Sequence, residues 1–127
     1  MLIKIAIVIF YSLLTILLAH IDAVKIRNGI KIKHGLNGLY YILMMIPAYL
    51  LLKNWLLIIG LLAVRRIVFD TALNLFRGLK YDYISATTTS IIDRLSYGFQ
   101  KKYGYVPYYL IFFIIILLSI IIPYGKT

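Results

Sequence analysis

Four apolar segments divide this chain of 127 residues, and they constrain its fold more than any other feature. A helix needs about 20 apolar residues, at 1.5 Å per residue, to span a hydrocarbon core of about 30 Å. We expect helices at about residues 2–24, 36–52, 55–77 and 106–123. Hydrophobic residues make up 63% of the chain and charged residues only 14%, against about 25% charged in soluble proteins. The sequence therefore predicts an all-α integral membrane protein with four transmembrane helices and excludes a soluble enzyme.

The first apolar segment, Leu2–Ile21, also has the position of a signal peptide. It is long for the apolar part of such a peptide, and no small-x-small cleavage site follows it, because Leu17 and Asp22 occupy the positions where one is needed. We therefore expect a retained transmembrane helix.

The third segment carries charge into the membrane. Its uninterrupted apolar part, Trp55–Val64, has only ten residues and is too short to span alone. To cross the bilayer the helix must continue to about Asn74, which takes Arg65, Arg66 and Asp70 into or near the bilayer. We expect an unbroken helix that ends at Gly78 as its C′ residue.

Helical spacing places four polar residues of this segment on one narrow stripe, here called the polar seam: Arg66, Asp70, Asn74 and Arg77. The stripe covers less than a quarter of the circumference, which is typical of a helix buried among others rather than of a surface helix. We expect Asp70 to pair with Arg66, one turn before it, or with Arg77, two turns after it. The favoured interpretation is a set of buried ion pairs and hydrogen bonds that fixes helix packing.

Charge asymmetry predicts an orientation. Fourteen Lys and Arg oppose four acidic residues, giving a formal net charge of +10. With four spans, the side that holds both termini carries three cations, and the side with the two longer connectors carries nine: Lys25, Arg27, Lys31, Lys33, Arg77, Lys80, Arg94, Lys101 and Lys102. The positive-inside rule then places both termini outside the cytoplasm, in what we interpret as a bacterial inner membrane. The basic side also attracts anionic headgroups, so lipid contact explains it without nucleic acid.

The connectors allow fewer conclusions. Val24–His34 fits either a β-hairpin around Asn28-Gly29 or a continuation of the first helix that stops at Asn28-Gly29 as its C-cap. The pattern of residues 90–103 predicts a short cytoplasmic helix that lies in the membrane interface. Its apolar stripe consists of Ile91, Ile92, Leu95 and Phe99. The tyrosines that flank the fourth span are interpreted only as interfacial anchors.

Two sets of candidate ligand-binding residues follow. Arg65, Arg66, Arg77, Lys31 and Lys33 are candidates for binding an anionic lipid or phosphate. His20, Asp22, His34 and Asp70 are candidate metal ligands, since two His with one or two Asp suit Zn, Mn or Fe. No motif with metal-ligand spacing supports them, the chain has no Cys, and no cofactor is predicted.

Three functions remain open on this evidence. The favoured one is a small polytopic membrane protein acting as a non-catalytic subunit or scaffold that binds lipid, a membrane protein or another copy of itself. The first alternative is a membrane-embedded, metal-dependent enzyme acting on a lipid phosphate at the cytoplasmic leaflet. The second is a holin-like pore-forming protein, suggested by small size and basic charge.

Overall fold

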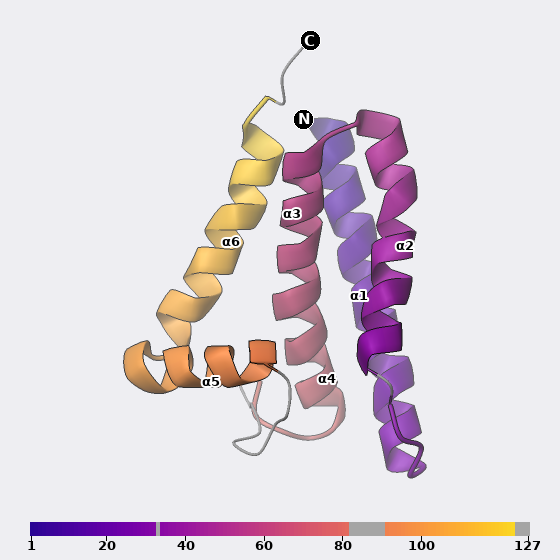
Figure 1. The fold of residues 1–127 in the computed structure, drawn as a ribbon, viewed down its shortest axis with the longest axis vertical. Helices are drawn as coiled ribbons and strands as arrows, with labels where there is room; N and C mark the ends of the chain where they lie inside the picture. Colours follow the sequence, from indigo (N-terminus) through magenta and orange to yellow (C-terminus); the bar gives the residue numbers. More distant parts are fainter. Residues whose placement is uncertain (33, 82–90, 124–127) are drawn as a thin grey trace.

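The computed structural model describes residues 1–32, 34–81 and 91–123, and all regular structure in these ranges is helical. The all-α prediction is thus confirmed. Long helices run side by side, and one short helix, α5, lies across the end of the bundle (Figure 1). The elements are α1 (Leu2–Arg27), α2 (His34–Leu52), α3 (Trp55–Val64), the π-helical segment η1 (Arg65–Phe69), α4 (Asp70–Phe76), α5 (Ile91–Tyr103) and α6 (Tyr105–Ile121).

The connection after α1 resolves the two alternatives left by the sequence in favour of the helix. Gly29 has φ +72°, and its N–H donates to the Ile26 carbonyl at 3.0 Å. The N–H of Ile30 donates to the Lys25 carbonyl at 2.9 Å. These two bonds form a Schellman motif, in which a left-handed glycine satisfies the last carbonyls of a helix.

The helix that ends at α4 stops in the same way, at the glycine expected from the sequence. Gly78 has φ +71° and donates to the Leu75 carbonyl, while Leu79 donates to the Asn74 carbonyl at 2.8 Å. Both connectors on the basic side therefore begin with a Schellman motif.

The expected helix over residues 55–77 is present as three consecutive segments, α3, η1 and α4, of ten, five and seven residues. The helical path continues through η1, but its hydrogen bonds change to the wider π pattern at the Arg65-Arg66 pair. The expectation of a regular helix was therefore incomplete, because hydrophobic periodicity does not detect a single widened turn.

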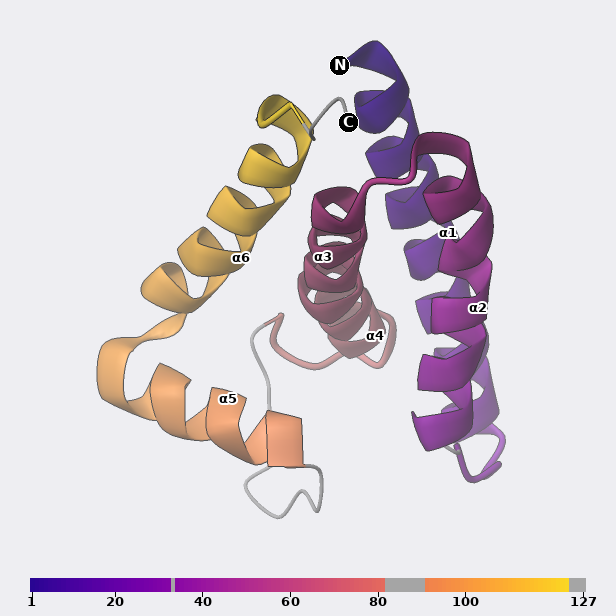
Figure 2. The ribbon, with the colours of Figure 1, turned by 45° about the horizontal axis from the view of Figure 1, so that its top comes forward.

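The α3 helix lies at the centre of the bundle and packs against α1, α2 and α6 (Figure 2). It approaches α6 most closely where Gly60 faces Ser119. A Cβ added to Gly60 would lie 2.6 Å from the Ser119 Cβ and closer still to its hydroxyl oxygen. This contact depends on the absence of a side chain at position 60.

Small and polar side chains share the interior with large apolar ones such as Tyr41, Leu57 and Leu61, and many other large apolar side chains cover the outside. Buried residues include Thr15, Ala19, Asp22, Ala23, Asn54, Gly60, Ala63, Asn74, Ser96 and Ser119. Exposed residues on α1, α2 and α6 include Ile3, Ile9, Phe10, Leu13, Leu17, Leu50, Leu51, Leu110, Phe113 and Ile121. A soluble protein would show the opposite distribution for its largest apolar side chains.

By length and composition, α1 is the one helix in the described ranges that is clearly long and apolar enough to cross a membrane, with 26 residues and a mean hydropathy of 2.5. Asn37–Leu52 and Tyr105–Ile121 form shorter apolar helices. The helix over residues 55–76 is divided by η1.

The short helix α5 contacts the bundle through polar and aromatic side chains. Leu95 is 70% exposed, whereas Ser96 is buried and the ring centre of Phe99 lies 6.2 Å from that of Tyr108. Asp93, one turn before Ser96, also faces the bundle because it reaches Arg66. The polar contacts of Asp93 and Ser96 and the ring contact of Phe99 therefore hold α5 in place.

Candidate functional site

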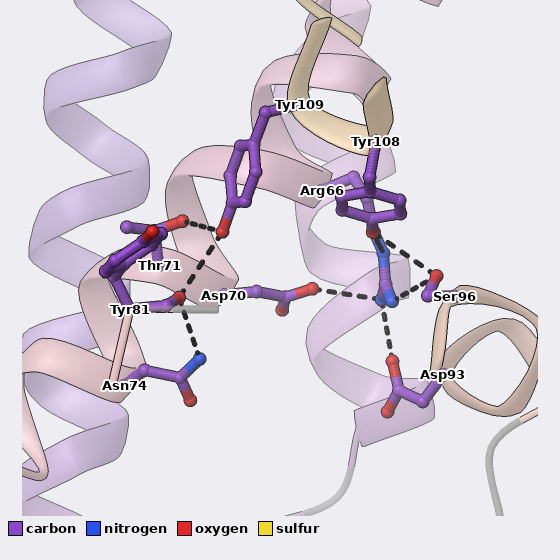
Figure 3. Close-up of polar contacts among 9 residues, drawn as sticks. All are labelled: Arg66, Asp70, Thr71, Asn74, Tyr81, Asp93, Ser96, Tyr108 and Tyr109. Atoms are coloured by element: carbon purple, nitrogen blue, oxygen red, sulfur yellow. Dashed lines mark hydrogen bonds and ion pairs between the residues drawn. The ribbon is translucent and has the colours of Figure 1, made fainter. Parts of the chain in front are cut away.

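Arg66 is the centre of a polar cluster that joins four elements (Figure 3). Its Nη1 lies 2.7 Å from Oδ1 of Asp93 on α5 and 3.0 Å from Oδ2 of Asp70 on α4. Its Nη2 donates to the Ser96 hydroxyl at 2.8 Å, and its Nε donates to the Tyr108 hydroxyl at 2.9 Å. The Tyr108 hydroxyl in turn donates to Ser96 at 3.2 Å. We call these five residues the Arg66 cluster.

Local structure explains how the Arg66 cluster forms. Arg66 and Asp70 are one turn apart, so their side chains meet along one face. Asp93 and Ser96 are three residues apart on α5 and share the face that turns to the bundle. Tyr108 is in the first turn of α6, which brings its hydroxyl to the end of the bundle where α5 crosses.

The electrostatics of the Arg66 cluster favour a stable charged state. The Arg66 side chain is only 18% exposed, whereas Asp70 and Asp93 are 38% and 37% exposed. Hydrogen bonds between ionised partners are roughly twice as strong as neutral ones. All three nitrogens of the guanidinium are directed at partners within the protein, so Arg66 links α4, α5 and α6.

A second group of polar contacts lies beside the Arg66 cluster (Figure 3). The Thr71 and Tyr109 hydroxyls are 2.8 Å apart. The Tyr81 carbonyl accepts from the Tyr109 hydroxyl at 3.3 Å and from Nδ2 of Asn74 at 3.2 Å. These bonds fix the chain that follows α4 against the first turns of α6.

The polar seam is only partly assembled as the sequence predicts. Asp70 pairs with Arg66, the first of its two expected partners. Asn74 is buried and bonds to a backbone carbonyl. Arg77 is exposed at the C-terminal end of α4 and does not extend the seam into the interior.

The candidate anion-binding residues are dispersed. The guanidinium of Arg65 lies 3.6 Å from the centre of the Phe69 ring and 5.8 Å from that of Tyr41 on α2, on the other side of η1 from the Arg66 partners. Such stacking of a guanidinium on aromatic rings stabilises the cation in an apolar environment. Lys31 is exposed beyond α1, and Lys33 lies outside the described residues.

The candidate metal ligands are also distributed over separate contacts. Asp22 is buried and accepts a hydrogen bond from Nδ2 of Asn37 at 2.8 Å. His20 stacks against Phe76 with ring centres 5.0 Å apart. Asp70 contacts Arg66, and the side chain of His34 lies outside the described part of the chain. In the part described, no three His, Cys, Asp or Glu side chains are grouped as a metal site would require.

Sequence reasoning missed Tyr108 and Ser96 as partners of Arg66. Tyr108 was assigned only an anchoring role, and Ser96 had no assignment. A usable signal existed, because a guanidinium in an apolar segment needs several hydrogen-bond acceptors, and Ser96 shares a face with Asp93 on a helix that the sequence did predict.

Comparison with protein-family models, curated proteins and solved structures finds no significant match to this chain. The site is therefore interpreted from its own geometry.

Proposed function

We propose that the chain is a four-span membrane protein that acts as a non-catalytic subunit or scaffold, with its basic end in contact with anionic lipid. In this proposal α1, α2, the continuous helix from α3 to α4, and α6 cross the bilayer. The short helix α5 lies in the cytoplasmic interface, and both termini are extracytoplasmic. Its partners are membrane lipids and either a membrane protein or further copies of the chain.

The distribution of side chains carries this proposal. Large apolar residues cover the outer faces of α1, α2 and α6, while Thr, Ser, Asn, Gly and Ala residues occupy helix contacts together with larger apolar side chains. Lipid hydrocarbon around the helices stabilises such an exterior. Within a membrane no hydrophobic force drives helices together, so small residues at the contacts favour association by allowing close packing. In water the same exterior would aggregate.

The placement of charge supports the orientation. Eight cations are exposed near the ends of α1 and α4 and on α5, all at one end of the bundle: Lys25, Arg27, Lys31, Arg77, Lys80, Arg94, Lys101 and Lys102. At the other end, Lys53 is exposed in the turn between α2 and α3, and Lys4 donates to the carbonyl of Ile122 at 2.9 Å. Each exposed cation near a membrane surface contributes about 1 kcal/mol of attraction to anionic lipid.

The Arg66 cluster supports a structural rather than a catalytic role. Its guanidinium is directed at Asp70, Asp93, Ser96 and Tyr108. A catalytic or anion-binding arginine would instead direct part of its donor fork at the position of a ligand. The contacts observed fix α5 to the transmembrane helices.

Cysteine labelling in intact cells tests the topology. Lys31→Cys and Lys101→Cys should be shielded from a membrane-impermeant thiol reagent, while Lys53→Cys and Lys126→Cys should be labelled. The chain has no native Cys, so each signal comes from the introduced residue alone. Labelling of positions 31 and 101 would contradict the orientation, and labelling of all four positions would contradict the membrane-spanning arrangement.

Native electrophoresis of membranes solubilised in a mild detergent tests the subunit role. The chain should migrate in a particle larger than a detergent-bound monomer, and chemical crosslinking before solubilisation should preserve that particle. Migration only as a monomer with and without crosslinking would contradict the role of subunit or scaffold.

A further inference from the structure

An apolar groove of about 430 Å³ lies along the first half of α6, beside η1 and the chain that follows α4. Its lining residues are aliphatic and aromatic: Ile67, Tyr81, Tyr105, Val106, Tyr109, Leu110 and Phe113. Its volume falls within the range of sites that hold small apolar ligands. The Arg66 cluster does not line it.

The groove has a direction. Val106, Tyr109, Leu110 and Phe113 are spaced at three and four residues, so they form one face of α6. This face extends over about 10 Å along the helix axis. It leads from Tyr105, beside the end of α5, toward the middle of α6, which is the direction of an acyl chain entering from the interface.

Two exposed lysines are close in sequence to lining residues at the end of the groove nearest α5. Lys80 is exposed and precedes Tyr81, whose ring centre lies 5.4 Å from that of Tyr105 and whose carbonyl accepts from Tyr109. Lys102 is exposed three residues before Tyr105, with its Nζ 5.1 Å from the centre of the Tyr103 ring, and the Cα atoms of Lys102 and Tyr105 are no more than about 11 Å apart. Two long, exposed cationic side chains are therefore anchored near this end, while uncharged side chains line the groove.

We infer that this groove binds one acyl chain of an anionic membrane phospholipid, whose phosphate contacts Lys80 and Lys102. The inference rests on the proposed membrane topology and adds a specific lipid site to it. A peptide helix would need a longer and wider apolar surface. An apolar groove about 10 Å long with two exposed lysines near one end matches one acyl chain and the phosphate of an anionic phospholipid.

Native mass spectrometry of the full chain in mild detergent tests the inference. The probes are phosphatidylglycerol and phosphatidylcholine with identical acyl chains, added separately. The wild-type protein should retain one phosphatidylglycerol with higher affinity than further copies and should retain phosphatidylcholine more weakly. Equal retention of the two lipids would overturn the assignment of the phosphate to Lys80 and Lys102.

Two adjacent substitutions on α6 provide a matched pair. Leu110→Trp fills the groove, whereas Ile111→Trp adds the same side chain on a face about 100° away. Both positions are about half exposed, at 53% and 46%. Leu110→Trp should weaken phosphatidylglycerol retention by about tenfold or more, and Ile111→Trp should leave it unchanged. Equal effects of the two would overturn the groove as the site.

Charge removal separates the headgroup contact from the acyl contact. Lys80→Gln with Lys102→Gln should lower the preference for phosphatidylglycerol over phosphatidylcholine by about 10- to 30-fold, with phosphatidylcholine retention unchanged. Lys53→Gln, at the opposite end of the bundle, should have no effect. A dimer that dissociates in Leu110→Trp would show instead that a second copy occupies the groove. If no lipid is retained while cysteine labelling confirms four spans, the inference fails and the proposed topology stands.

Discussion

The two ends of α6 are held to the bundle by different physical means. Near its C-terminal end, Ser119 packs directly against Gly60 of α3, and Lys4 of α1 donates to the backbone carbonyl of Ile122 at 2.9 Å. Near its N-terminal end, Tyr108 and Tyr109 reach their partners through hydroxyl groups. Figure 2 shows α6 inclined to α3. Small residues allow close approach at one end, whereas long polar side chains bridge a wider separation at the other.

This difference shows how a nearly uniform apolar helix acquires one fixed position. Residues such as Ile, Leu and Phe on α6 can pack at many rotations. The hydroxyl contacts of Tyr108 and Tyr109 select one rotation at the N-terminal end. The Gly60 contact and the Lys4 hydrogen bonds fix the C-terminal end. Disruption of either end should therefore loosen that end first.

Arg66→Leu should have the largest effect. It removes all four contacts of the guanidinium, including those to two carboxylates that are more than a third exposed, and the loss of a hydrogen bond to a charged group costs about 1.5 to 3 kcal/mol. Denaturation of the detergent-solubilised protein, followed by circular dichroism, measures the free energy of unfolding. Stability equal to that of the wild type would mean that the polar end does not hold α6 and α5.

Gly60→Ala should have the next largest effect on the free energy of unfolding, because the added methyl group would clash with Ser119. Overpacking of this kind costs about 1 to 3 kcal/mol. Fluorescence of Trp55, the only tryptophan, reports unfolding at this end of α3. The double variant with Ser119→Gly should recover most of the loss. A double variant as unstable as Gly60→Ala would refute the close approach.

Asp70→Asn and Asp93→Asn should each cost about 1 to 2 kcal/mol, because each keeps a hydrogen-bonding side chain while removing one charge from Arg66. The two substitutions should loosen different parts of the protein, since Asp93 is on α5 and Asp70 is on α4. Limited proteolysis within residues 78–104 should therefore accelerate more in Asp93→Asn. Equal acceleration in both would show that Asp93 has no special role in docking α5.

Tyr108→Phe should have the smallest effect, about 0.5 to 1.5 kcal/mol, because it removes one hydroxyl and keeps the ring. Tyr103→Phe is a matched control, since Tyr103 is exposed at the end of α5. A loss of stability in the control as large as in Tyr108→Phe would show that the Arg66 hydrogen bond is not the cause.

The sequence predicted the elements better than their contacts. Apolar segments and glycine stop signals located the helices and the end at Gly78, because these properties are local. The pairing of Arg66 with Asp70 followed from helical spacing. Tyr108 and Ser96, by contrast, are on other helices than Arg66. The Gly60 contact also joins two helices, and the sequence has no Gly-x-x-x-Gly motif that would predict it. Tertiary packing decides these contacts, and periodicity carries no information about it.

The contacts of α5 could be predicted only in part. The sequence predicted an amphipathic helix over residues 90–103 without saying which residues dock it, and the structure places Asp93, Ser96 and Phe99 against the bundle while Leu95 is exposed. Asp93 and Ser96 bond to Arg66, which belongs to another helix, so the periodicity of α5 does not reveal these contacts.

The π-helical segment η1 makes the third helix sensitive to chain length as well as to side-chain identity. A π turn holds one residue more than an α turn between bonded groups. Deletion of Val68 would allow a regular α-helix from Trp55 onward, with every apolar residue of α3 unchanged. It would leave the rotational phase of α4 relative to α3 nearly unchanged, because a π turn uses about one extra residue for the same rotation. The inserted residue therefore sets the hydrogen-bond pattern at Arg65 and Arg66, while Asp70 and Asn74 keep their faces.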